Sequence, residues 1–184
     1  MNLYNSVAIN QPDLADKVLE IGEKALKLSE TRPHVYFEMG QAAFTKKEFD
    51  RGLEYFRKAI ALNPEPRETQ LNYLLATIFG RKESLTVEQM KFMKDKYGGF
   101  SENDYRNIAR GYASVGNDRK VIETFREATK TFPTSDFYAQ LAGAYGKICD
   151  IPNARAAANE AARLNPDLSS AVVQFLQQTE QTCQ

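Results

Sequence analysis

The chain has little of what catalytic and metal sites are made from. Its 184 residues contain no tryptophan, one histidine (His34) and two cysteines (Cys149 and Cys183). A lone histidine assembles neither a convincing Ser/His/Asp set nor a histidine-rich metal site, and the two cysteines form no CxxC pattern. We therefore predict no catalytic, cofactor-binding or metal-binding residue. We interpret both cysteines as free thiols, which favours a reducing compartment such as the cytoplasm.

Charge of one sign and long apolar runs are lacking too. Basic and acidic residues number 24 each, so the formal net charge is zero. Nucleic-acid binding by bulk electrostatics needs a basic stripe, and this class is excluded. No apolar run approaches the roughly 20 residues that cross a bilayer. Residues 1–12 lack a basic start followed by an apolar stretch, so we expect no signal peptide and no membrane span.

What the chain does have is a repeat. Small side chains recur at successive intervals of 34, 34, 35 and 33 residues, at Ala25, Ala59, Met93 (standing in), Ala128 and Ala161. A helix-stopping residue follows the same rhythm, at Pro64, Gly98, Pro133 and Pro166. A fixed period of this size indicates stacked helical units that bury their apolar faces against each other.

Each unit reads as two helices. In the second unit, residues 34–45 and 49–62 have apolar side chains at helical spacing, and Gly40 and Gly52 would let two antiparallel helices approach closely. The fourth unit starts at Ser101, an N-cap with an acidic residue three positions on. The third unit is degenerate, with helices predicted over 67–80 and 85–97 and a stop at Gly98 and Gly99. The first unit has a short, poorly patterned helix over 2–9 and a convincing one over 13–29.

The pattern resembles the tetratricopeptide repeat (TPR). Tyr36 or Tyr138 stands at the usual tryptophan, and Phe56 and Phe125 match the aromatic residue of the second helix. The resemblance implies an all-α, right-handed superhelical solenoid of antiparallel helix pairs, with about five units and a C-terminal capping helix. We expect a single array over 1–184, with units at about 1–31, 32–66, 67–100, 101–134 and 135–167 and the cap at 168–180.

A TPR array would bind a protein partner on its concave face, which the first helix of each unit lines. Matching the units by phase predicts a groove for a peptide or a helix, with arginines that meet an acidic group. Its residues are Phe37, Gln41 and Phe44 in the second unit, Leu71, Leu75 and Ile78 in the third, and Arg106, Asn107 and Arg110 in the fourth. The fifth unit offers only the small residues Ala139, Gly143 and Gly146.

Other interpretations of these residues stay open. Phe44, Ile78, Leu71 and Leu75 would serve equally as packing between helices, and the arginines as ion-pair partners of nearby acids. The lysine and asparagine clamp with which some TPR domains hold acidic tails is absent from the second unit, although Arg106 and Asn107 offer part of an analogous site.

Two functions therefore stand. The first is a non-catalytic scaffold for protein interactions. The second rests on a narrower resemblance, over residues 25–180, of the runs ALKLSETRPHVYFEMGQAAF and DFYAQLAGAYGKICDIPNARAAANEAARLNP to the C-terminal TPR tails of bacterial O-antigen ligase-like membrane proteins. It implies a tail that positions partners or a glycan carrier, with the membrane spans and the catalytic part outside this chain.

Overall fold

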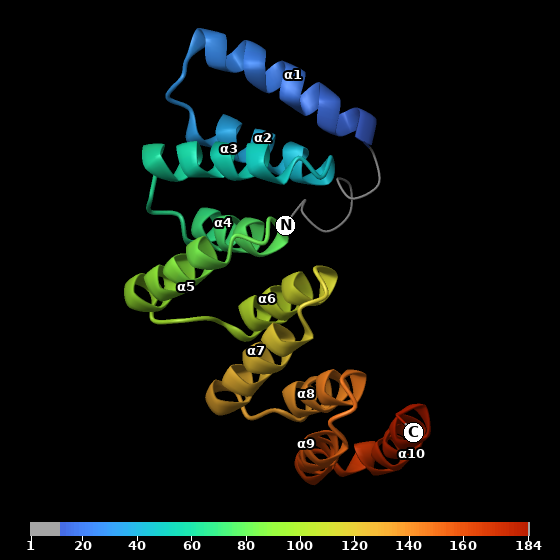
Figure 1. The fold of residues 1–184 in the computed structure, drawn as a ribbon. Coiled ribbons are helices and arrows are strands. Elements are labelled where there is room, and N and C mark those ends of the chain that lie inside the picture. The colour runs from blue at the N-terminus through green and yellow to red at the C-terminus, as the bar shows by residue number, and fades with distance from the viewer. Residues whose placement is uncertain (1–11, 184) are drawn as a thin grey trace. The chain divides into compact units, whose positions relative to one another are not determined.

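The computed structural model describes residues 12–183, and this part of the chain is all α-helical (Figure 1). The helix predicted over 2–9 lies outside the described residues. Ten α-helices and one short 3₁₀ helix follow one another in the described part. They are α1 (Pro12–Leu28), α2 (Pro33–Thr45), α3 (Phe49–Leu62), α4 (Arg67–Phe79), α5 (Glu83–Tyr97), α6 (Glu102–Ser114), α7 (Asp118–Thr131), α8 (Ser135–Lys147), α9 (Ile151–Leu164), η3 (Pro166–Leu168) and α10 (Ser169–Thr182).

The helices form two compact bodies, an N-terminal body (Met1–Gly99) and a C-terminal body (Phe100–Gln184), each of which holds several repeat units. In the N-terminal body α2 packs on α3 and α4 on α5, and α1 packs on α2. In the C-terminal body α6 packs on α7 and α8 on α9, and α10 packs on α9. This paired arrangement, about five helix pairs in all, confirms the predicted all-α repeat fold. Among the described residues, none of the helices has the length and apolar character needed to span a bilayer.

The turn inside each helix pair has a common shape. The second residue after the first helix adopts the left-handed conformation, and the N–H of the next residue bonds back to the last turn, as from Glu48 to the Ala43 carbonyl oxygen at 2.9 Å. The left-handed residues are Lys47 (φ 62°), Arg81 (φ 55°), Gly116 (φ 74°) and Cys149 (φ 57°). Their spacing of 34, 35 and 33 residues repeats the period of the small side chains.

Glycine allows α2 and α3 to approach, as predicted. A Cβ atom placed on Gly52 would lie 2.3 Å from the ring of Phe44 and 3.1 Å from the carbonyl oxygen of Gly40. The Phe44 ring fills this space and packs edge-on against Phe49 and at a tilt against Phe56, with centroids 5.3 and 5.8 Å away. Small residues at these positions therefore follow from helix packing.

The degenerate third unit keeps the helix pair by a different means. Between α4 and α5, buried polar side chains replace apolar contacts. Thr86 donates a hydrogen bond to the Thr77 hydroxyl at 2.9 Å, and the Gln89 amide donates to Gln70 Oε1 at 2.8 Å. Gln70 is only 2% exposed and in turn donates to the carbonyl oxygen of Pro64. Because these groups have partners, burying them does not carry the full desolvation cost.

Helix ends agree with the sequence signals. Ser101 caps α6 in a reciprocal capping box, in which Asp104 N–H donates to Ser101 Oγ at 3.3 Å and Ser101 N–H donates to Asp104 Oδ2 at 2.7 Å. Gly98 ends α5 in the left-handed conformation, with φ 72°. Both features lie where the sequence signals predicted a helix end and a helix start.

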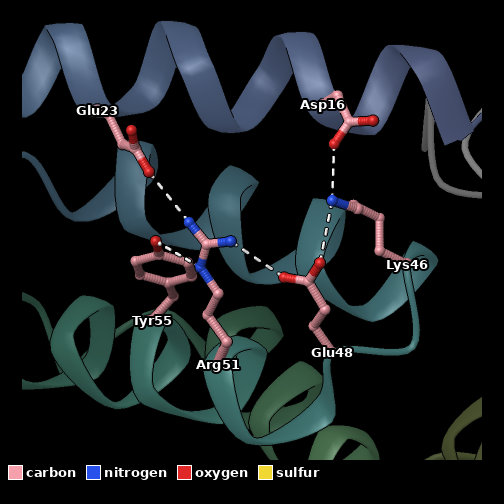
Figure 2. A network of polar contacts seen from close by, with 6 residues as sticks. All are labelled: Asp16, Glu23, Lys46, Glu48, Arg51 and Tyr55. Carbon is pink, nitrogen blue, oxygen red and sulfur yellow. Dashed lines mark hydrogen bonds and ion pairs between the residues drawn. The ribbon is translucent and has the colours of Figure 1, made fainter.

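A network of charged groups fixes α1 to the α2–α3 hairpin (Figure 2). Lys46 bridges Asp16 at 2.7 Å and Glu48 at 3.0 Å, and Arg51 bridges Glu48 and Glu23, both at 3.0 Å. The hydrogen bond from Lys46, followed by that from Arg51, lowers the pKa of the Glu48 carboxyl. The alternating charges form a chain of pairs that joins α1 to the α2–α3 turn and to α3, an arrangement that stabilises more than isolated surface pairs do.

The cysteines are not free thiols, contrary to the sequence-based interpretation. Cys149 and Cys183 form a disulfide, with Cα atoms 5.5 Å apart. Their separation of 34 residues equals the repeat period, which places them at corresponding points of two successive units. A disulfide also removes the basis for expecting a reducing compartment.

Candidate peptide-binding faces

In the N-terminal body, two predicted groove residues on α2 pack against neighbouring helices. The Phe44 ring lies between α2, α3 and α4, with a further edge-on contact to Phe79 at 6.3 Å. Phe37 packs edge-on against Phe56 at 5.6 Å, beside the cluster of Leu53, Phe56 and Ala76. Both phenylalanines are half-buried, so most of each ring belongs to the helix interface.

The three predicted groove residues on α4 differ in burial. Ile78 is 2% exposed, so its place in the predicted groove is wrong: it belongs to the core. By their spacing Leu71, Leu75 and Ile78 share one side of α4, so the burial of Ile78 comes from what covers that end of the helix and not from its position around the helix axis. Leu71 and Leu75 are half-buried and keep part of their surface open to solvent.

Gln41 borders a hollow between α1 and α2. The hollow has a volume of about 60 Å³ and is lined by Leu14, Ala15, Val18, Glu38, Gln41, Ala42 and Thr45. The Gln41 amide nitrogen is buried and has no hydrogen-bond partner within the described residues. A buried donor without a partner is costly, and this unpaired amide distinguishes Gln41 from Glu38 and Thr45, the other polar side chains that line the hollow.

In the C-terminal body, Arg106 already forms ion pairs with acidic side chains of the protein. Its guanidinium donates to Asp136 Oδ2 at 3.0 and 3.2 Å and to Glu102 Oε2 at 3.2 Å. It also lies over the ring of Phe137, 4.7 Å from the centroid. The hydrogen bond with Asp136 raises the pKa of Arg106, so the charge is held at all ordinary pH values. The ion-pair interpretation of this arginine therefore describes the structure.

Most of the other predicted groove residues on α6 and α8 keep surface exposed to solvent. Arg110 on α6 is exposed, and Asn107 beside it is half-buried. On α8, Ala139 and Gly143 are exposed, and a Cβ atom on Gly143 would meet nothing within 4 Å. Gly146 differs, because a Cβ atom there would lie 3.1 Å from Phe175 and 3.2 Å from Thr179 of α10. Gly146 is thus covered by the terminal helix and belongs to packing.

Two features escaped the sequence reasoning. The Arg106–Asp136 contact joins residues 30 apart in the chain, which no local pattern marks. The disulfide did leave a signal, since the cysteine separation equals the repeat period. Equal phase puts two residues at matching points of neighbouring units, where a bond can form.

Comparison with known proteins bears on the repeat. Residues 33–66 match the family model described as tetratricopeptide repeat. The fold is similar to that of MamA from Desulfovibrio magneticus RS-1, with a TM-score of 0.60, 14% identity, and coverage of 84% of this chain and 88% of that chain. It is also similar to YrrB, described as a TPR protein with an unusual peptide-binding site, with a TM-score of 0.57, 16% identity, and coverage of 92% and 84%.

A further similarity is to a chain in the structure of Naa15/Naa10 bound to HypK-THB, with a TM-score of 0.57, 16% identity, and coverage of 92% of this chain and 27% of that one. These matches support the repeat family, and they give no support to the narrower resemblance to O-antigen ligase-like proteins. Residues 33–66 thus match the tetratricopeptide repeat, and the described helices have the paired arrangement of a TPR solenoid.

Proposed function

We propose that this chain is a non-catalytic interaction module that binds a peptide or helix on the open faces of its first helices. The face formed by α6 and α8 in the C-terminal body supports the proposal best. Arg110, Ala139 and Gly143 are all exposed there, and Gly143 has no neighbour that requires a glycine. A glycine in a helix interior costs up to about 1 kcal/mol relative to alanine. Its presence without a packing reason suits a surface that a ligand approaches closely.

Arg110 supplies the charge of this face. Because Asp136 and Glu102 already hold the guanidinium of Arg106, Arg110 is the arginine available to a ligand carboxylate. Asn107, one turn away, adds an amide. The partner that fits is a peptide or helix with small or flat contacts over α8 and an acidic group near α6.

The N-terminal body offers a second, more apolar face on α4. Leu71 and Leu75 lie four residues apart on α4 and share one side of that helix. Both remain partly open, whereas Ile78, further along the same side, is buried in the core. This face suits the apolar side of an amphipathic helix.

Substitution at Gly143 tests the main face without disturbing the fold. Gly143 is exposed, a Cβ atom there meets no neighbour, and leucine has good helix propensity, so Gly143→Leu should fold and still obstruct a ligand. Peptides selected from a random library on the wild type should bind this variant at least about tenfold more weakly, a loss of about 1.4 kcal/mol. Gly143→Ala is the matched control and should bind nearly as the wild type does. Equal affinity for the leucine variant would refute the proposed face.

The charge and the apolar face have their own controls. Arg110→Glu should weaken acidic peptides, while Arg119→Glu on α7, also exposed, should not. Leu71→Glu with Leu75→Glu should abolish capture of a helical peptide. Val87→Glu on α5, at a position 59% exposed, should leave it unchanged. Equal recovery by folded variants and wild type would contradict the assignment.

A further inference from the structure

The disulfide joins the terminal helix to the turn before α9. Cys149 follows α8 in the left-handed position of the turn, and Cys183 directly follows α10. Each cysteine lies fourteen residues beyond the first residue of its helix, 149 − 135 and 183 − 169. The bond therefore ties equivalent points of two successive first helices and holds the last helix in its place in the array.

Without the bond, α10 is weakly attached. Thr179, 9% exposed, is its one buried residue, whereas α8 buries Phe137, Leu141 and Ala142. Its ion pair, between Arg155 and Glu180, joins side chains that are 53% and 39% exposed. Exposed pairs contribute little because water and salt screen them. Its other contacts are made by half-buried side chains, which pack on α9 and, at Phe175 and Thr179, against Gly146 of α8.

We propose that the Cys149–Cys183 disulfide is a redox latch that holds α10 in place and releases it on reduction by a dithiol. Cys149 is exposed, so a reductant can reach its sulfur atom in the folded protein. The latch stands independently of the peptide-binding faces proposed above.

The exchange balances with a dithiol as the co-reactant. A thiolate of the dithiol attacks Sγ of Cys149, which forms a mixed disulfide and expels Cys183 as a thiolate that takes up a proton. The second thiolate of the reductant then attacks its own bonded sulfur atom and expels Cys149, which is protonated in turn. Two electrons and two protons pass to the protein, and the reductant becomes a cyclic disulfide.

Release of α10 changes which surfaces of the C-terminal body are exposed. It uncovers Gly146 on α8 and the side of α9 near Arg155, and it exposes the half-buried Phe175 and Leu176 of α10 itself. Terminal helices with a polar outer face keep a repeat array soluble and closed at its end. The oxidised protein thus has a capped end, and the reduced protein has an open one.

Hydrogen exchange on the full chain tests the latch. The amides of residues 169–182 are compared in the oxidised protein and after treatment with dithiothreitol, with mass spectrometry counting the thiols that iodoacetamide labels. On reduction without denaturant, we expect two labelled thiols and exchange in α10 that is faster by about tenfold or more, with α6 and α7 unchanged. Unchanged α10 exchange with both thiols labelled overturns the proposal.

Two further outcomes also decide it. Cys183→Ser should show the fast α10 exchange with or without dithiothreitol, and slow exchange in this variant overturns the latch. Labelling of both thiols in protein kept under oxidised glutathione, before any reductant is added, would show that the bond does not form and overturns it as well.

Discussion

Substitution of Cys149 by glycine separates two effects that oppose each other at one position. The closed loop spans a separation of 34 residues. For a loop of this size the chain-entropy model gives a change of about −12.6 cal/mol/K in the unfolded state, or about 3.8 kcal/mol at 25 °C. Against this, φ of Cys149 is 57°, and a side chain in the left-handed conformation costs about 1 kcal/mol that glycine avoids.

The sign of the effect should therefore depend on redox state. Under oxidising conditions Cys149→Gly should be roughly 3 kcal/mol less stable than the wild type, because it loses the cross-link and regains only the backbone term. Under a phosphine reductant the wild type loses the cross-link too, and the variant should be equal or up to about 1 kcal/mol more stable. The chain has no tryptophan, so urea denaturation is followed by far-UV circular dichroism, with hydrogen exchange of α8 and α9 localising the effect.

Lys47→Gly is the matched control. Lys47 is exposed and occupies the same left-handed position, with φ 62°, in a turn without a disulfide. It should gain up to about 1 kcal/mol equally in both redox states. If oxidised wild type and oxidised Cys149→Gly have the same stability, or if the reductant leaves the wild type unchanged, the cross-link contributes nothing and the reasoning fails.

Other predictions concern the packing and the charges. Gly52→Ala should cost about 1–3 kcal/mol, since its Cβ atom overlaps the aromatic ring above it, while Gly143→Ala should be neutral or stabilise by up to about 1 kcal/mol; a thermal melt that ranks them otherwise contradicts the packing. Thr86→Val should cost about 1 kcal/mol by leaving the Thr77 hydroxyl oxygen without its donor, and the double variant with Thr77→Val should cost less than the two single changes added together. Because folding lowers the pKa of Glu48, its network contributes fully to stability above the ordinary glutamate pKa of 4.5, and this contribution is lost as the pH falls below that value. Glu48→Gln should flatten the loss of stability between neutral and acidic pH, and an unchanged slope would refute the assignment.

Some of the structure could be read directly from the residues because it is local or periodic. The capping box at Ser101 needs only a hydroxyl and a carboxylate three residues apart, and the stop at Gly98 needs only a residue that tolerates positive φ. Gly52 could be placed in a close helix approach because a helix pair repeats its contacts in every unit. These signals survive even in the degenerate third unit, whose helices lie where the phase predicts.

The candidate faces were less readable. Phase alone placed Ile78 beside Leu71 and Leu75 on one side of α4, but the packing around that side decides which of the three is buried. Likewise, equal phase made Arg106 and Arg110 look alike. The aspartate that occupies only the first of them comes from the next unit, and its reach depends on how α6 and α8 lie together.

The sequence by itself determined the repeat, the helix pairs and their ends, because these depend on side-chain size and backbone preference at short range. The tertiary structure alone decided which face residues remain open, which buried polar groups find partners across α4 and α5, and that Cys149 meets Cys183. The physical reason is distance: each of these contacts joins two helices, and a helical pattern specifies the face of one helix without specifying the neighbour that covers it.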